Sequence, residues 1–201
     1  MPIEGTPWRR VCGVILLGIA LGALRDAAAA ELSPLLDRIH WGDSADEIAQ
    51  RFGPRALRLA TPIEFGDSYV DVALRDQRLG GYRFVVYFQM EKATRRLKRV
   101  MLERPRHGVN PAVFRAMLAA LQRDYGAPVQ DCATSAARRN GYQAAGERDW
   151  GVAGFVLHAV FRDTTLEAGE GCTAAGGSAC GLTGQLFVQI TPQDMAGPPC
   201  R

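Results

Sequence analysis

The sequence predicts an α+β fold in which two helix-plus-antiparallel-meander halves pack into one disulfide-stapled unit. Three observations lead to this prediction. Two helix-ending patterns of similar composition, Phe52-Gly53-Pro54 and Tyr125-Gly126-Ala127-Pro128, lie in the two halves of the 201-residue chain. Segments after each pattern alternate apolar and polar residues with the two-residue period of β-strands. Beyond the N-terminal segment lie four cysteines, an even number that suits two disulfides.

Residues 1–30 have the pattern of a cleaved signal peptide. Trp8-Arg9-Arg10 is a positive n-region, residues 11–24 form an apolar run, and residues 27–30 are small alanines that suit cleavage. The alternative is an uncleaved membrane anchor, for which the apolar run is short. We therefore expect export to the periplasm or the extracellular medium, with a mature chain that begins at Glu31.

The mature chain is expected to divide into two α+β halves, residues 31–108 and 109–201. No Pro/Ser-rich linker separates them, and each is small for a self-sufficient core, so we expect them to pack together. Removal of residues 1–30 takes away three arginines and two acidic residues, so the formal charge falls from +3 to +2. This charge is too small to indicate nucleic acid as a partner.

Two short helices are predicted to open the first half. Ser33-Pro34 has the N-cap residue and the N1 proline that begin the first helix. Ser44 and Glu47 form a capping box that begins the second, and Gly53-Pro54 ends it.

Three strands are predicted to follow in an antiparallel meander. They are Ser68–Arg75, Tyr82–Met90 and Arg96–Arg104. Tyr82–Met90 has the longest alternating run in the chain, so we expect it to be a central strand. In the third strand, alternation places Lys98 on the inward face with Val100, which predicts a twist or a bulge.

The second half is predicted to repeat this order of elements. Asn110-Pro111 begins a helix that Gly126 ends. Residues 132–147 are polar and rich in Ala and Gly, which favours a loop or an irregular strand. Residues 155–161 and 186–190 alternate as the two strands of a hairpin.

Export makes disulfides the expected state of the cysteines beyond the leader. Cys172 and Cys180 bracket a Gly-rich segment, so a local loop closure between them is natural. That pairing leaves Cys132 to join Cys200, although four cysteines permit three pairings. A metal site is the alternative, but the spacings lack CxxC pairs and no histidine lies close in sequence.

The stretch Gly42-x-Ser44-x-x-Glu47-Ile48-x-x-x-Phe52-Gly53-Pro54 resembles the helix signature of the SmpA/OmlA (BamE-like) family. A helix-helix-meander unit used twice in tandem is similar to the beta-lactamase inhibitory proteins. No lipobox cysteine is present, and Pro54 follows Gly53 directly. The resemblance therefore implies contact with another protein, in envelope assembly or as an inhibitor, rather than outer-membrane anchoring.

A search for catalytic patterns predicts a non-enzymatic protein without cofactor or metal. The mature chain has three histidines, His40, His107 and His158, and none has a metal-ligand neighbour at i+2 or i+4. There is no Gly-x-Ser-x-Gly elbow, no dinucleotide-binding loop and no Walker loop. Within an alternating strand, His158 is expected to be an ordinary outward or half-buried residue.

A basic patch gives the first candidate binding surface. It consists of Arg95, Arg96, Lys98 and Arg99. Such charges are also typical of an edge strand, where they prevent pairing with other strands. The functional interpretation is weak, salt-sensitive attraction to an acidic protein face or to anionic lipid headgroups.

The exposed sheet face around Tyr82 and Tyr87 is the second candidate surface. We expect an exported, non-enzymatic protein that binds a protein partner in the cell envelope. The alternatives are a small-ligand-binding protein or a hydrolytic enzyme that uses this face, and an envelope protein with no specific ligand. A deep pocket with converging polar groups would favour the ligand-binding or enzymatic alternative.

Overall fold

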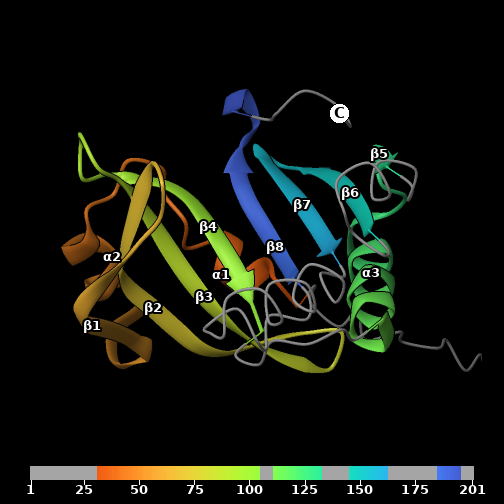
Figure 1. Cartoon of the computed structure of the whole chain (residues 1–201), viewed down its shortest axis with the longest axis horizontal. Coiled ribbons are helices and arrows are strands. Elements are labelled where there is room, and N and C mark those ends of the chain that lie inside the picture. The colour runs from red at the N-terminus through yellow and green to blue at the C-terminus, as the bar shows by residue number, and fades with distance from the viewer. Residues whose placement is uncertain (1–30, 105–110, 133–144, 163–184, 196–201) are drawn as a thin grey trace, which may run out of the picture.

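The structure is a computed structural model that describes residues 31–104, 111–132, 145–162 and 185–195 (Figure 1). Its helices are α1 (Ser33–Leu36), α2 (Ala45–Phe52) and α3 (Pro111–Tyr125), with short 3-10 turns at Gly53–Arg55 and Gln193–Met195. Its strands are β1 (Ala56–Glu64), β2 (Ser68–Leu79), β3 (Tyr82–Glu91), β4 (Leu97–Glu103), β5 (Gln130–Cys132), β6 (Ala145–Val152), β7 (Phe155–Arg162) and β8 (Gln185–Pro192). Among these residues, no helix has the length and hydropathy of a membrane span.

One eight-stranded antiparallel sheet dominates the described structure. The strand order is β1-β2-β3-β4-β8-β7-β6-β5, so each half of the chain supplies four neighbouring strands (Figure 1). The last strands of the halves, β4 and β8, pair from Val100 opposite Ile190 to Glu103 opposite Phe187. The predicted fold class, two packed and disulfide-stapled α+β halves, is therefore wrong, because the halves share one continuous sheet and the helices are few and short.

No disulfide joins two of the described residues. Cys132, at the end of β5, is the only cysteine among them. Cys172, Cys180 and Cys200 lie outside the described residues, and so do both predicted pairings. What joins the described parts of the two halves is the β4–β8 ladder and a shared hydrophobic core.

The sheet contains strands that the sequence patterns did not predict. β1 is an edge strand that is exposed from Ala60 to Glu64, and its pairing with β2 shifts register between Arg58 and Ile63. It has no buried face to produce alternation, and it contains Pro62, which an edge strand tolerates. The prediction of a loop or an irregular strand covers residues 132–147, which include only Ala145–Glu147 of β6, and no strand is predicted for the rest of β6.

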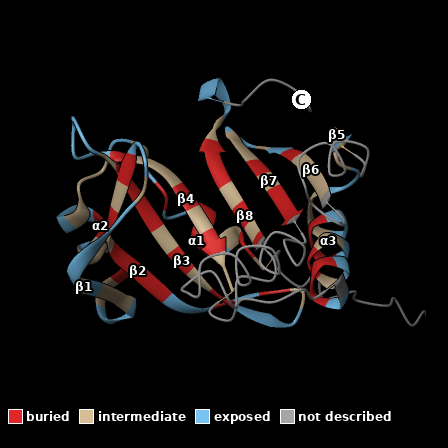
Figure 2. Cartoon of the chain, viewed as in Figure 1, coloured by how far each residue is buried: buried red, intermediate tan, exposed pale blue. Residues whose placement is uncertain are grey.

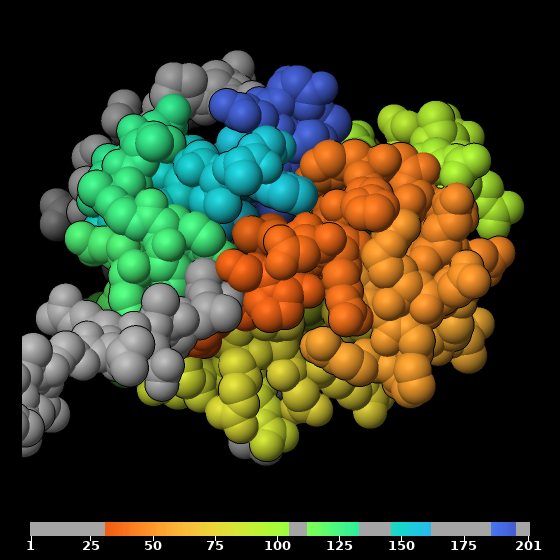
Figure 3. All heavy atoms as spheres, turned by 180° about the vertical axis from the view of Figure 1, so that it is seen from behind, coloured from red at the N-terminus to blue at the C-terminus, as the bar shows by residue number. Residues whose placement is uncertain are grey.

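The helices cover one face of the sheet. The Phe52 ring of α2 lies 5.2 Å from the Phe88 ring of β3. The Phe114 ring of α3 stacks on Phe161 of β7 at 5.1 Å. Figure 3, the view from behind, shows the orange N-terminal segment and the green α3 over this side of the molecule. One core of buried side chains therefore runs under elements of both halves.

Strand alternation fills this core as the sequence patterns predict for β2, β3 and β4. On β3, for example, Phe84, Val86 and Phe88 are fully buried, while Val85 and Tyr87 are only partly buried. The central strands in Figure 2 accordingly carry alternating bands of buried and intermediate residues. On β3 the second face is thus less buried than the helix-covered face.

The predicted start of α2 and the predicted ends of α2 and α3 are confirmed, whereas the predicted Ser33 N-cap is wrong, because the N-cap of α1 is Leu32, which has no side-chain cap hydrogen bond. In the capping box, Ser44 N donates to Glu47 Oε2 at 2.7 Å, and Glu47 N donates to Ser44 Oγ at 3.3 Å. Gly53 and Gly126 end α2 and α3 with positive φ values of 55° and 82°. The Gly126 carbonyl also accepts a 2.9 Å hydrogen bond from the indole of buried Trp150, which connects the end of α3 to β6.

The β2–β3 turn packs closely against α3. A Cβ on Gly80 would lie 2.6 Å from the carbonyl carbon and oxygen of Ala116, so only glycine fits this approach. Gly80 also has a φ of 60°, a conformation that glycine adopts without steric cost. A turn of the first half is therefore seated on the helix of the second half.

Candidate functional site

A row of side chains crosses the sheet on the face away from the helices. The cross-strand neighbours are Tyr87, Met101, Gln189, His158 and Asp149, taken from β3, β4, β8, β7 and β6 in order. All five are partly buried. Because Met101 and Gln189 lie at the β4–β8 seam, both halves of the chain contribute to one continuous row.

A second row runs beside the first. Its cross-strand neighbours are Val85, Glu103, Phe187, Val160 and Glu147. We call these two rows together the open face. It combines apolar side chains with carboxylates; in the second row Val160 is fully buried and the other four residues are partly buried.

His158 lies between two carboxylates on the open face. Asp149 is directly opposite it on β6, and the His158 Nδ1 atom is hydrogen-bonded to Asp149 Oδ1. On the other side of the ring, Nε2 lies 3.8 Å from Glu147 Oε2. The imidazole is 31% exposed and therefore accessible. We name His158, Asp149 and Glu147 the His158 cluster.

The His158 cluster has the chemistry of an oriented imidazole. A carboxylate bonded to one ring nitrogen sets the tautomer and the ring orientation, and leaves the other nitrogen for a partner or for proton transfer. No group of three or more His, Cys, Asp or Glu among the described residues is arranged to hold a metal ion. The cluster was missed in the sequence because its carboxylates lie on a strand that was not predicted.

A second charged cluster lies where β4 begins. Asp67 accepts a 2.9 Å hydrogen bond from Lys98 Nζ and is also paired with Arg99. Arg99 further donates to Ser68 Oγ at 3.1 Å and to Gln89 Oε1. The Lys98 hydrogen bond and the Arg99 charge lower the pKa of Asp67 to about 2. We name these residues the Arg99 cluster.

A β-bulge explains why two neighbouring cations reach one carboxylate. Gln89 pairs with Arg99 and Met90 pairs with Leu97, so Lys98 is the extra residue on β4. The bulge predicted from the misplaced charge at Lys98 is confirmed. Without it, strict alternation would send Lys98 and Arg99 to opposite faces.

The other two arginines of the basic patch also have internal partners. Arg96 Nη1 lies 3.3 Å from Glu47 Oε2 and donates to the Gly42 carbonyl at 3.4 Å. Arg95 Nε donates to the Tyr69 hydroxyl at 3.4 Å, which raises the pKa of Arg95. β4 as a whole is not an edge strand, because it pairs with β3 and with β8, but its pairs with β8 run only from Val100 to Glu103 and do not include Lys98 or Arg99.

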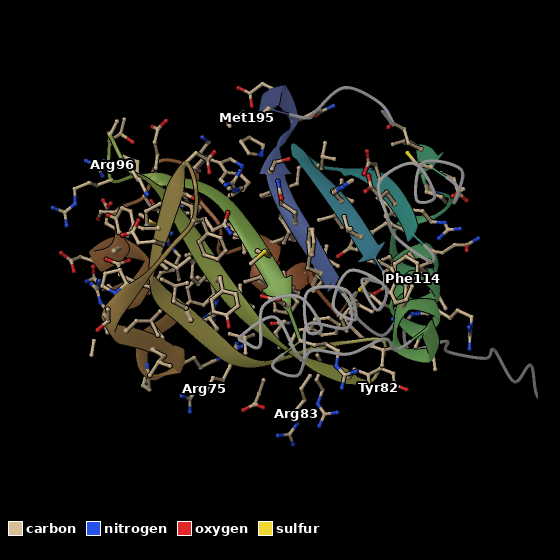
Figure 4. All side chains as sticks on the ribbon, in the orientation of Figure 1. Arg75, Tyr82, Arg83, Arg96, Phe114 and Met195 are labelled. Atoms are coloured by element: carbon tan, nitrogen blue, oxygen red, sulfur yellow. The ribbon has the colours of Figure 1, made fainter. Side chains whose placement is uncertain are left out.

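The two candidate tyrosines lie on opposite faces of β3. Tyr82, at the first position of β3, is 36% exposed and lies under the Arg104 guanidinium at 5.5 Å from the ring centre. Tyr87 belongs to the open face, where burial and the charge of Glu103 raise its pKa. Figure 4 shows Tyr82 and Arg96 far apart, Tyr82 at the start of β3 and Arg96 beyond its other end, before β4. The candidate residues therefore do not form one site.

Comparison with protein-family models, with curated proteins and with solved structures gave no match. The resemblance to the SmpA/OmlA family and to the beta-lactamase inhibitory proteins accordingly stays a prediction. The open face, the His158 cluster and the Arg99 cluster are therefore the candidate functional features of the described residues.

Proposed function

We propose that this chain is an exported, non-enzymatic protein that binds another protein through the open face, in envelope assembly or as an inhibitor. The observation that carries the proposal is the row that runs from Tyr87 through Met101 and Gln189 to His158. This row needs strands from both halves. A face of this length is suited to a protein surface rather than to a single small ligand.

The side chains of the open face indicate the chemistry of the partner. Tyr87, Met101 and Phe187 offer large apolar or aromatic groups that are already partly desolvated. Glu103 and Glu147 lie beside them in the second row. We expect a partner whose contact surface has an apolar centre.

A matched pair of substitutions tests this proposal. Gln189→Arg places a long cation at the seam of the open face, whereas Gln50→Arg makes the same change on the exposed side of α2. Exported wild-type chain, cross-linked in the envelope fraction, should recover one stoichiometric partner. Gln189→Arg should lose that partner and Gln50→Arg should keep it. Equal recovery by both variants would contradict the proposal.

The His158 cluster favours one alternative, a hydrolytic enzyme or small-ligand binder. An imidazole held by Asp149 is the arrangement of a general base. In this alternative, purified protein turns over simple ester substrates, and His158→Gln abolishes the turnover while leaving thermal stability unchanged. Equal rates for the wild-type and His158→Gln proteins would exclude catalysis by this imidazole.

A further inference from the structure

Glu31, the expected first residue of the mature chain, is held in place by three polar contacts. Its backbone nitrogen donates to Asp124 Oδ2 at 3.0 Å, and its carbonyl accepts from Gln77 Nε2 at 3.1 Å. Its own carboxylate lies 3.2 Å from Arg123 Nη2. The residue after it, Leu32, is fully buried in the core. The chain is therefore fixed in the fold from the point where the leader is expected to end.

Asp124, which accepts the hydrogen bond from the Glu31 nitrogen, is a carboxylate with very little exposure to water. Its side chain is only 4% exposed, and its other oxygen accepts a 2.7 Å hydrogen bond from Arg123 Nε. A carboxylate this far from water requires strong partners, and charged donors form stronger hydrogen bonds than neutral amides. The Glu31 nitrogen lies at hydrogen-bond distance from the oxygen that Arg123 does not occupy.

The local charge around Glu31 is unbalanced while its nitrogen is an amide. The carboxylates of Glu31 and Asp124 face the single guanidinium of Arg123, so the formal charge of the group is −1. Glu31 Oε2 is also buried without a hydrogen-bond partner among the described residues. A positive charge with additional donors at the Glu31 nitrogen would bring the formal charge to zero.

We propose that leader removal supplies this charge, because hydrolysis of the Ala30–Glu31 bond leaves an α-ammonium on Glu31 that forms an ion pair with Asp124. One water is consumed, the Ala30 carbonyl becomes a carboxylate, and the Glu31 nitrogen leaves as an amine that is protonated at neutral pH. The leader peptidase of the export pathway catalyses the step. The proposal depends on the predicted leader and not on the proposed binding function.

The consequence is that the mature protein is more stable than its precursor. An amide donates one hydrogen bond with a partial charge, whereas an ammonium brings a full charge and three donors to a nearly buried carboxylate. Pairing of a buried charge is stabilising relative to the same charge with a weaker partner. Removal of the leader would therefore strengthen the contact between the mature N-terminus at Glu31 and Asp124 of α3.

The test uses the full chain, exported and processed by the host. N-terminal sequencing should find Glu31 as the first residue. Insertion of one glycine between Ala30 and Glu31 moves the ammonium away from Asp124 but keeps the amide contact. We expect this insertion to lower the melting temperature by about 5 °C. In an Asp124→Asn background, the insertion should have no further effect.

A control and a second readout complete the test. Asp46, whose side chain is 93% exposed, provides the control, and the insertion should keep its full effect in Asp46→Asn. The pairing should also make acylation of the wild-type α-amine about tenfold slower than that of the insertion variant. This readout does not depend on the folding of any Asp124 variant. A different first residue, equal insertion effects in both aspartate backgrounds, or equal acylation rates would overturn the proposal.

Discussion

Met101 on β4 and Gln189 on β8 lie directly opposite each other where the two halves of the chain meet. Their neighbours in the same ladder, Leu102 and Val188, are fully buried on the helix-covered face. The β4–β8 pair therefore joins the two halves on both faces of the sheet. On the helix-covered face it contributes to the shared core, and on the other face it makes the open face continuous. We propose that partner binding takes place on the open face.

The shared core predicts one cooperative unfolding transition. Leu102→Ala should lower the free energy of unfolding by about 2–5 kcal/mol, because it leaves a cavity beneath the seam. Fluorescence and circular dichroism should report coincident transitions in urea for the wild-type and variant proteins. Met101→Ala, on the open face, is the control and should cost less. Two separate transitions would contradict a single unit.

The contact between the β2–β3 turn and α3 predicts different effects at two adjacent glycines. Gly80→Ala should destabilise the protein by about 3 kcal/mol or more, because the new Cβ meets the Ala116 backbone. Gly81 also has a positive φ, but its Cβ position is open, so Gly81→Ala should cost only about 1–2 kcal/mol of backbone strain. Urea unfolding measures both values. Equal losses would show that the turn is not seated on α3.

The Arg99 cluster predicts a pH dependence of stability. The folded-state pKa of Asp67 is about 2, below its ordinary value of 3.8, so its ionised form is favoured in the folded protein. This contribution is fully present above pH 4 and is lost as pH falls towards 2. Its size is at most about 1 kcal/mol, because the Asp67 side chain is 51% exposed and its ion pairs are screened.

Comparison of the wild-type protein with Asp67→Asn measures this contribution. The difference in unfolding free energy between the two proteins should be largest near pH 5 and should shrink towards pH 2. Glu64→Gln, which removes the carboxylate paired with Lys92, provides a control at another exposed ion pair. A difference that stays constant from pH 5 to pH 2 would contradict the assigned role of Asp67.

The basic patch predicts weak binding to anionic vesicles at low salt. Simultaneous charge reversal at Arg95 and Arg99 should remove this binding, and about 0.5 M salt should remove it from the wild-type protein as well. Charge reversal at exposed Arg38 and Arg55 is the matched control for net charge. Co-sedimentation with vesicles measures each case. Equal losses in the two double variants would show that only net charge matters.

The core and the helix ends could be predicted from the sequence because each leaves a local pattern. The capping box at Ser44 and Glu47 spans a single helical turn, and the alternation on β3 spans one strand. The edge strand β1 could not be predicted in this way. With Ala60 to Glu64 exposed, its sequence carries no alternation that marks a buried face.

The candidate site was harder to predict from the sequence because the residues in contact there are far apart along the chain. Asp67 and Arg99 are 32 residues apart, and they meet only because β2, β3 and β4 pair in this register. His158 is predicted to be an ordinary strand residue, because its partners Asp149 and Glu147 lie on β6, and the sequence predicts only a loop or an irregular strand up to Glu147. Alternating charges before the β6–β7 turn were the available signal for this hairpin.

The affinity of the purified partner for two glutamine variants shows whether the open face is the binding surface. If the open face is the binding surface, Gln189→Arg weakens binding at least about 100-fold, the equivalent of 2.7 kcal/mol, whereas Gln50→Arg leaves the Kd unchanged. Both variants should retain the wild-type melting temperature. Wild-type affinity for a folded Gln189→Arg protein would contradict the assignment of function to the open face.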